Sequence, residues 1–273
     1  MRSGREGEAD PSDKRAEQNF HKANKNRAGD WVVNHLLILP AARRAFGGVY
    51  VYVHPAALSL RGKAAVPAIF CATHAGWWDG YLAGIINRNV FKHDGYLMME
   101  EDSLKRYPFF TWTGVFGVDR DHPRKALASI HYSAQLLAGH TGSALWIFPQ
   151  GTITHPDARP LRLYGGVAAI ARRVGRCALV PVALRYEFRM EQAPDAFAHA
   201  GPPLVIDAQA ERLSSKDITS RLEAAMVGAS DALRDDLVSN NLRAYRRILS
   251  GRGSSNRIWD GLLRVLGTGR SGS

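Results

Sequence analysis

The segment Ala68-Ile-Phe-Cys-Ala-Thr-His74-Ala-Gly-Trp-Trp-Asp79-Gly80 joins a short apolar run directly to the start of a second, longer pattern. Residues 68–73 are apolar and bounded by polar or turn-forming positions, which predicts a buried strand. Residues 77–86 follow the spacing of a helix. A strand that leads at once into a helix is the repeating unit of an α/β sandwich.

The same alternation continues along the chain from Gly47 to about Tyr186. We expect strands at 49–53, 68–73, 96–99, 144–148 and 178–184, and helices at 77–86, 125–138 and 166–174. A strand at 203–206 and a long amphipathic helix at 218–238, with Ser and Asp caps near its start, complete the pattern. The predicted fold is α/β, with a mostly parallel central sheet flanked by helices. Ligands of such sheets bind where strands end and helices begin.

The two ends of the chain differ from this middle part. Residues 1–30 are polar and highly charged, which predicts a mobile arm. Residues 31–250 form the expected domain, and its first segment, Trp31–Leu39, is an apolar helix that Pro40 ends. Such a helix is either part of the core or an interfacial anchor. Residues 251–273 are a basic tail with the spacing of an amphipathic helix that carries Trp259.

Composition and charge narrow the class of protein. Of the 273 residues, 45% are hydrophobic and 22% charged, which excludes collagen, a disulfide scaffold and wholesale disorder. The 36 Lys and Arg exceed the 25 Asp and Glu by 11, so an anionic partner is expected: nucleic acid, a membrane surface or a phosphate-bearing substrate. Seven Arg and one Asp between Leu242 and Ser273 supply +6 of this charge.

The two cysteines and the hydropathy pattern indicate where in the cell the protein is expected. Cys71 and Cys177 lie inside apolar runs, which predicts buried free thiols in a reducing compartment and leaves no structural zinc site. The amino terminus lacks the pattern of a signal peptide, and no run of 18 apolar residues is present. We therefore expect a cytoplasmic protein, associated peripherally with the cytoplasmic face of the membrane.

The pair His74 and Asp79 carries the clearest chemistry. A strand delivers the histidine at its carboxyl end, and the carboxylate follows five residues later as a helix begins, so the two side chains can meet across the turn. One ring nitrogen would then accept a proton from an attacking hydroxyl while Asp79 holds the other. The alternative is a hydrogen-bonded structural histidine next to a helix-capping aspartate.

Three more segments follow in a recognisable order: Gly117-Val-Asp-Arg120, Phe148-Pro-Gln-Gly151-Thr152 and Leu179-Val-Pro181-Val182. Together with His74-x4-Asp79 they resemble the four sequence blocks of the glycerolipid acyltransferase family, which includes the 1-acylglycerol-3-phosphate acyltransferases. Each block is weak alone. All four in order, from His74 to Val182, make a specific signal.

The resemblance implies transfer of a fatty acyl group from a thioester, acyl-CoA or acyl carrier protein, to a hydroxyl of a lysophospholipid. It implies His74 as general base, Asp79 as its orienting partner and Arg120 as a clamp for the acceptor phosphate. Arg has the planar fork that suits phosphate, and the N–H groups of Gly151 and Thr152 suit an anion. The alternative for Arg120 is a surface ion pair with a neighbouring aspartate.

Departures from the family pattern leave the acceptor open. The family commonly has Asn where Thr73 stands, Ser at Gly76, Glu at Gln150 and Arg at Ile153. Arg159 and Arg162 are candidates for the missing cation, so we expect the acceptor pocket to include both, with Gln150, Gly151 and Thr152. The acceptor is then lysophosphatidic acid, another lysolipid, or a non-phosphorylated hydroxyl such as that of a glycosylated isoprenoid.

The remaining expectations concern cofactors and partners. We expect no cofactor and no metal, with the acyl thioester as co-substrate, a lysolipid acceptor and an anionic membrane surface as partners. Nucleic-acid binding is not expected, since the basic tail lacks stacking aromatics at strand spacing. The main rival to the enzyme is a lipid-binding relative that lost transfer. Acyl-chain length, acyl carrier and oligomeric state stay open.

Overall fold

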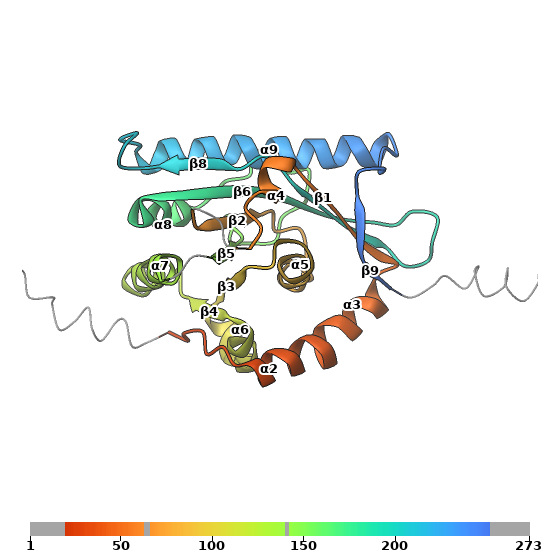
Figure 1. Ribbon diagram of the computed structural model, residues 1–273, viewed down its shortest axis with the longest axis horizontal. Helices are drawn as coiled ribbons and strands as arrows, with labels where there is room; N and C mark the ends of the chain where they lie inside the picture. Colours follow the sequence, from red (N-terminus) through yellow and green to blue (C-terminus); the bar gives the residue numbers. More distant parts are fainter. Residues whose placement is uncertain (1–19, 63–65, 140–141, 252–273) are drawn as a thin grey trace, which may run out of the picture.

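The fold is a central nine-stranded sheet with helices on both faces, as a computed structural model of the chain shows (Figure 1). The structure describes residues 20–62, 66–139 and 142–251. The strands are β1 (Gly48–Val53), β2 (Ala68–Ala72), β3 (Asp94–Glu100), β4 (Val115–Val118), β5 (Ser143–Ile147), β6 (Arg176–Glu187), β7 (Asp195–Ala200), β8 (Leu204–Asp207) and β9 (Arg246–Ser250). The helices are α2 (Arg27–Val32), η1 (Val33–Ile38), α3 (Leu39–Ala45), α4 (Pro55–Leu58), α5 (Asp79–Ile86), η2 (Asn87–Phe91), α6 (Glu101–Arg106), η3 (Pro108–Thr113), α7 (Pro123–Ala138), α8 (Gly166–Val174) and α9 (Ser215–Val238).

The strand order is β4-β3-β5-β2-β6-β7-β1-β9, with β8 paired to β6. The neighbours from β4 to β6 all pair in parallel, whereas β6–β7, β6–β8 and β1–β9 are antiparallel. The predicted α/β fold with a mostly parallel sheet is therefore confirmed. The strands β4, β7 and β9 were not predicted.

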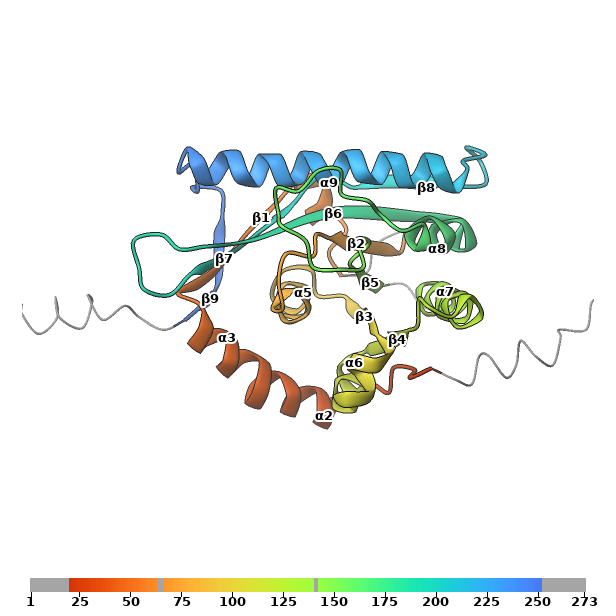
Figure 2. The ribbon, with the colours of Figure 1, turned by 180° about the vertical axis from the view of Figure 1, so that it is seen from behind.

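Alternate residues of β2 enter two separate cores, because successive side chains of a strand point to opposite faces. Ala68, Phe70 and Ala72 pack with α5 and the α2–α3 helices, whereas Ile69 and Cys71 pack with α7, α8 and α9. In Figures 1 and 2, α9 runs along one side of the molecule and α2–α3 along the opposite side. The two cysteines are free and buried, as predicted.

The long helix α9 begins at Ser215, three residues before the predicted start at 218, and ends at Val238 as predicted. Ser214 is the N-cap of α9, and its side chain accepts a hydrogen bond from the Asp217 backbone N–H. The Asp217 side chain accepts one from the Ser214 backbone N–H, which completes a capping box. Within the described residues, none of the helices has the length and apolar character needed to cross a membrane.

The amino-terminal helix corrects one prediction. Pro40 does not end it, because η1 is a π-helical turn in which the Leu39 N–H bonds the Asn34 carbonyl, five residues back. Pro40 then occupies the first turn of α3, where its missing N–H costs no helical bond, and the helix continues to Ala45.

The described part of the predicted mobile arm, residues 20–30, packs on the domain. Phe20 is buried in the core beside α7, and the His21 ring bonds the buried Glu101 carboxylate at 2.7 Å. These two contacts hold a stretch whose composition alone indicated disorder. Residues 1–19 and the basic segment of the tail from 252 to 273 lie outside the described residues.

Candidate active site

The candidate site lies at the carboxyl ends of the parallel strands. His74 follows β2, Arg120 follows β4, and the segment Phe148–Thr152 follows β5. Since β2, β3, β4 and β5 run parallel, their carboxyl ends lie along the same edge of the sheet. The topology therefore gathers three of the four sequence blocks at one edge.

His74 and Asp79 meet across the turn between β2 and α5. The distance from His74 Nδ1 to Asp79 Oδ2 is 2.7 Å. The Asp79 side chain has no exposed surface, whereas 24% of the His74 side chain is exposed. The imidazole ring stacks on Phe148, with ring centres 4.7 Å apart. A buried carboxylate thus fixes one ring nitrogen of a histidine whose other nitrogen, Nε2, has no protein partner among the described residues.

The Asp79 carboxylate accepts four hydrogen bonds. Its Oδ2 accepts the His74 ring and the backbone N–H groups of Ala75 and Gly76, at 2.7 and 2.9 Å. Its Oδ1 accepts the hydroxyl of Tyr186. Tyr186 was not predicted as a site residue, because it lies 107 residues from Asp79 in the chain. This full set of donors supports an ionised carboxylate in a buried position.

Arg120 is exposed and lies over the Tyr164 ring, with the guanidinium carbon 5.4 Å from the ring centre. Its neighbour Asp119 instead pairs with His122 and Lys125, at 2.8 and 3.0 Å, and their hydrogen bonds lower the pKa of Asp119 to about 2. None of the ion pairs within the described residues includes Arg120. The guanidinium is therefore available to an anion.

Gly151 makes room for that guanidinium. Its φ of +67° lies in the left-handed region, and a Cβ there would stand 2.0 Å from Arg120 Nη1. Only glycine satisfies both conditions. Thr152 is exposed beside it at the edge of a large cavity.

The cavity has a volume of about 1280 Å³, and His74 is among the residues that line it. One part follows α5 and β3 and is lined by Gly80, Gly84, Leu97, Met99 and Phe110. The side chains of two ion pairs, Lys25–Asp94 and Arg88–Asp30, also line the cavity. Another part lies between α7 and α8 and is lined by Ala126, Ile130, Val167 and Ile170. Trp77, Ile153 and Tyr164 are exposed side chains at its rim.

The family of the chain follows from comparison with known sequences. The sequence model of the family described as Acyltransferase matches residues 51–185. These residues form an acyltransferase domain. The match spans His74, Asp79, Arg120 and the segment Phe148–Thr152, so the edge of the sheet described above belongs to that domain. No curated protein matches the chain significantly.

Gln150 has a different place in the acyltransferase domain from the one predicted. It is 5% exposed and does not line the cavity. Its Oε1 accepts the His74 backbone N–H at 2.8 Å, and its Nε2 bonds the Thr154 hydroxyl. The Thr154 N–H in turn bonds the His74 carbonyl at 2.9 Å. Gln150 therefore ties the loop after β5 to the backbone of His74, and its amide, with one donor and one acceptor, suits both contacts.

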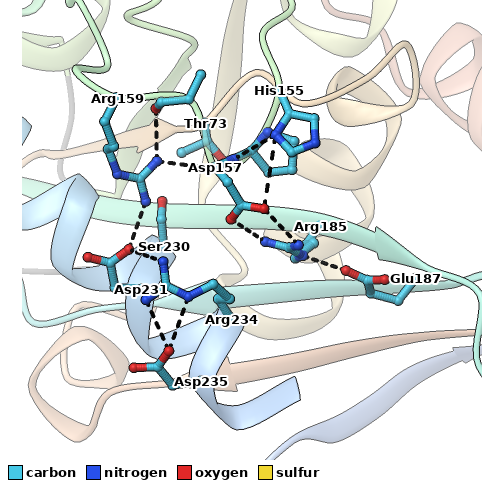
Figure 3. A network of polar contacts seen from close by, with 12 residues as sticks. Thr73, His155, Asp157, Arg159, Arg185, Glu187, Ser230, Asp231, Arg234 and Asp235 are labelled. Carbon is cyan, nitrogen blue, oxygen red and sulfur yellow. Dashed lines mark hydrogen bonds and ion pairs between the residues drawn. The ribbon is translucent and has the colours of Figure 1, made fainter. Parts of the chain in front are cut away.

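Arg159 and Arg162 do not join the acyltransferase site. Figure 3 shows Arg159 in a network on the α9 side of the domain, where it pairs with Asp231 at 2.8 Å and donates to the carbonyls of Pro156 and Ala158. Arg162 is exposed and lines no part of the cavity. The structure therefore does not bring these two arginines to the cavity that His74 lines.

Proposed function

We propose that the protein transfers a fatty acyl group from an acyl thioester, acyl-CoA or acyl carrier protein, to a hydroxyl of a lysophospholipid such as 1-acylglycerol-3-phosphate. The observation that carries this proposal is the His74–Asp79 pair at an apolar cavity that is also lined by Arg120, which has no ion-pair partner among the described residues. The base suits the acceptor hydroxyl, the apolar channel suits an acyl chain, and the Arg120 cation suits a phosphate.

The proton and bond changes balance without a covalent enzyme intermediate. Neutral His74 takes the proton of the acceptor hydroxyl on Nε2 as the oxygen attacks the thioester carbonyl. The carbon–sulfur bond breaks, and the leaving thiolate takes the proton back from the imidazolium. Asp79 stays ionised throughout, holds Nδ1 in its protonated form and stabilises the imidazolium charge. The thioester already has an activated carbonyl, so positioning supplies much of the remaining acceleration.

The two parts of the cavity fit two acyl chains. We assign the part along α5 to the donor chain, because Gly80 and Gly84 leave the helix surface open there: a Cβ at either position would meet no atom within 4 Å. We assign the part between α7 and α8 to the chain of the acceptor, because Arg120 and Tyr164 precede these helices and border the same cavity. A lysolipid brings an acyl chain of its own, so donor and acceptor together fill both parts of the cavity. This arrangement favours a lysolipid over a water-soluble alcohol as the acceptor.

The acceptor phosphate is assigned to Arg120 together with the amino-terminal end of α8. Gly165 and Gly166 line the cavity there, and a Cβ at either position would meet no atom within 4 Å, so a ligand has room to approach the start of α8. A cation and a helix amino terminus both favour an anion.

Replacement of the arginine tests this headgroup assignment. Arg120→Ala should raise the KM of the acceptor roughly ten- to hundredfold, since it removes a charged hydrogen-bond donor, and should leave the KM of the donor nearly unchanged. Steady-state kinetics with each substrate varied in turn measure both values. Arg173→Ala, an exposed arginine at the far end of α8, is the matched control. Equal effects of Arg120→Ala on both substrates would assign it a structural role.

A panel of acceptors tests the proposed function as a whole. Thiol release from acyl-CoA and acyl carrier protein donors is measured with lysophosphatidic acid, other lysophospholipids and a glycosylated isoprenoid. We expect release that depends on a phosphate-bearing lysolipid. Release with the glycosylated lipid alone would move the acceptor to a non-phosphorylated hydroxyl, in line with Ile153 in place of the family arginine at the rim. Binding without release would leave a lipid-binding relative.

We also propose that α2, η1 and α3 attach the protein to an anionic membrane. Trp31, Leu36 and Leu37 are 54%, 58% and 46% exposed, and Arg43 and Arg44 follow in the last turn of α3. Apolar side chains followed by basic ones suit the membrane interface. On the opposite side of the same helix, Asn34 and Ile38 are buried and line the cavity. The helix would thus place the cavity next to the lipid.

Sedimentation with vesicles tests this attachment. Binding to anionic vesicles should weaken at high salt, as each Lys or Arg contributes on the order of 1 kcal/mol, and should persist in part because apolar burial depends little on salt. The double change Leu36→Ser and Leu37→Ser should lower the remaining affinity roughly tenfold or more. Leu58→Ser, another exposed leucine, is the control. Failure of the unaltered protein to sediment at low salt would contradict the attachment.

A further inference from the structure

We propose that Tyr186 is a positioning residue that fixes the Asp79 carboxylate and, through it, the basicity of His74. This inference rests on the proposed function, since it assigns a role within the same site. The hydroxyl of Tyr186 donates to Asp79 Oδ1, the carboxylate oxygen that faces away from His74.

The length of β6 brings Tyr186 to the site. Val182 pairs with Ala72, the last residue of β2, and β6 continues from there to Glu187. The strand therefore runs past the end of its neighbour into the space where the turn with His74 and Asp79 lies. Tyr186 is on this overhanging part.

Among the described residues, Tyr186 is the sole partner of one carboxylate oxygen of Asp79. Within the described residues, Asp79 Oδ2 has three donors and Oδ1 has this hydroxyl alone. The Asp79 side chain is fully buried, so no solvent replaces a lost donor there. Without the hydroxyl, a buried charged oxygen loses its partner and the carboxylate is held from one side only.

The ring of Tyr186 is itself held in place. It stacks on the buried Phe46, with ring centres 5.6 Å apart and planes 14° from parallel. A Cβ at Gly76 would stand 3.0 Å from Tyr186 Cε2, closer than an ordinary contact, so glycine at position 76 eases the close approach of the turn to the ring. This contact accounts for glycine at a position where the family often has serine. The ring and the turn fit each other.

The neighbours of Tyr186 anchor the end of β6. Arg185 pairs with Asp157 at 2.7 Å and with Glu187 at 2.5 Å (Figure 3). The hydroxyl also keeps its proton, because burial and the negative charge of Asp79 raise the pKa of Tyr186 far above its ordinary range. Tyr186 is thus protonated at neutral pH and donates to Asp79.

The hydroxyl influences the base in a direction that can be derived. A hydrogen bond to Asp79 draws negative charge away from the oxygen that faces His74. Removal of this bond leaves more negative charge on the oxygen that faces His74, which stabilises the imidazolium more strongly than in the unaltered protein. The base must be neutral to act, so the acidic limb of kcat/KM would move to higher pH.

Tyr186→Phe tests the inference because it keeps the ring and removes only the hydroxyl. We expect kcat to fall roughly ten- to hundredfold, the KM of both substrates to stay within about twofold, and the acidic limb of kcat/KM to move upward. Tyr50→Phe is the matched control, because the Tyr50 ring is also stacked, on Phe197 at 5.3 Å, and lies outside the site. Unchanged kcat together with an unchanged pH profile would overturn the inference.

A second variant separates positioning from a loss of folding. In an Asp79→Asn background the hydroxyl has no charged oxygen to orient, so Tyr186→Phe should cause almost no further loss of turnover. Independent losses that multiply would show that Tyr186 acts elsewhere and would overturn the inference. Failure of the proposed function has a different signature: no acyl transfer by the unaltered protein, or undiminished transfer by His74→Ala.

Discussion

His74→Ala is expected to lower kcat by roughly 10²- to 10⁴-fold or more, because it removes the general base and leaves only binding and positioning. Donor and acceptor should still bind, since the cavity and Arg120 do not depend on the imidazole. The Asp79 carboxylate keeps three of its four donors: the N–H groups of Ala75 and Gly76 and the Tyr186 hydroxyl. The fold should therefore survive the change.

Thermal unfolding and vesicle binding are the controls for that variant, and both should match the unaltered protein. His131→Ala, an exposed histidine on α7, repeats the same change away from the site and should leave turnover intact. A well-folded His74→Ala protein with undiminished turnover would remove the base from the mechanism.

Gly84→Leu is expected to shorten the acyl chain that the enzyme accepts. Gly84 lines the cavity part along α5, and a Cβ there would meet no atom within 4 Å, so a leucine side chain has room to enter the channel. Turnover of long-chain donors should fall roughly a hundredfold or more, while short-chain donors keep most of theirs. Leucine also has the higher helix propensity, so stability should rise by up to about 1 kcal/mol.

The matched control is Gly228→Leu. Gly228 lies in α9, is exposed, and has no atom within 4 Å of a Cβ position. It should gain similar helix stability with no change in chain-length preference. A Gly84→Leu protein that loses long and short donors equally would contradict the assignment of the channel to the donor chain.

Local sequence patterns predicted the elements around His74 and Asp79. The strand and helix on either side of this turn are contiguous in the chain, and the continuous apolar run of β2 follows from burial on both faces. The contact between the two side chains needs only a five-residue turn. These features could be predicted because each depends on neighbours along the chain.

Features that depend on distant parts of the chain could not be predicted in the same way. Tyr186 reaches Asp79 only because β6 pairs with β2 and extends beyond its carboxyl end. Gln150 and Arg159 belong to one loop, yet one bonds the backbone of His74 and the other pairs with Asp231 on α9. The composition of the loop does not predict which of the two side chains contacts His74. The continuation of the first helix past Pro40 depends on a π-helical turn that no local signal announces.

The central claim is that a hydroxyl activated by His74 receives the acyl group of a thioester. The most direct measurement follows thiol release and acylated lipid together, in one reaction of the purified protein with acyl-CoA and 1-acylglycerol-3-phosphate. The account predicts one thiol released for each acylated lipid formed, and neither product with His74→Ala above the uncatalysed rate. Thiol release without acylated lipid, or equal formation of both products by His74→Ala, would contradict it.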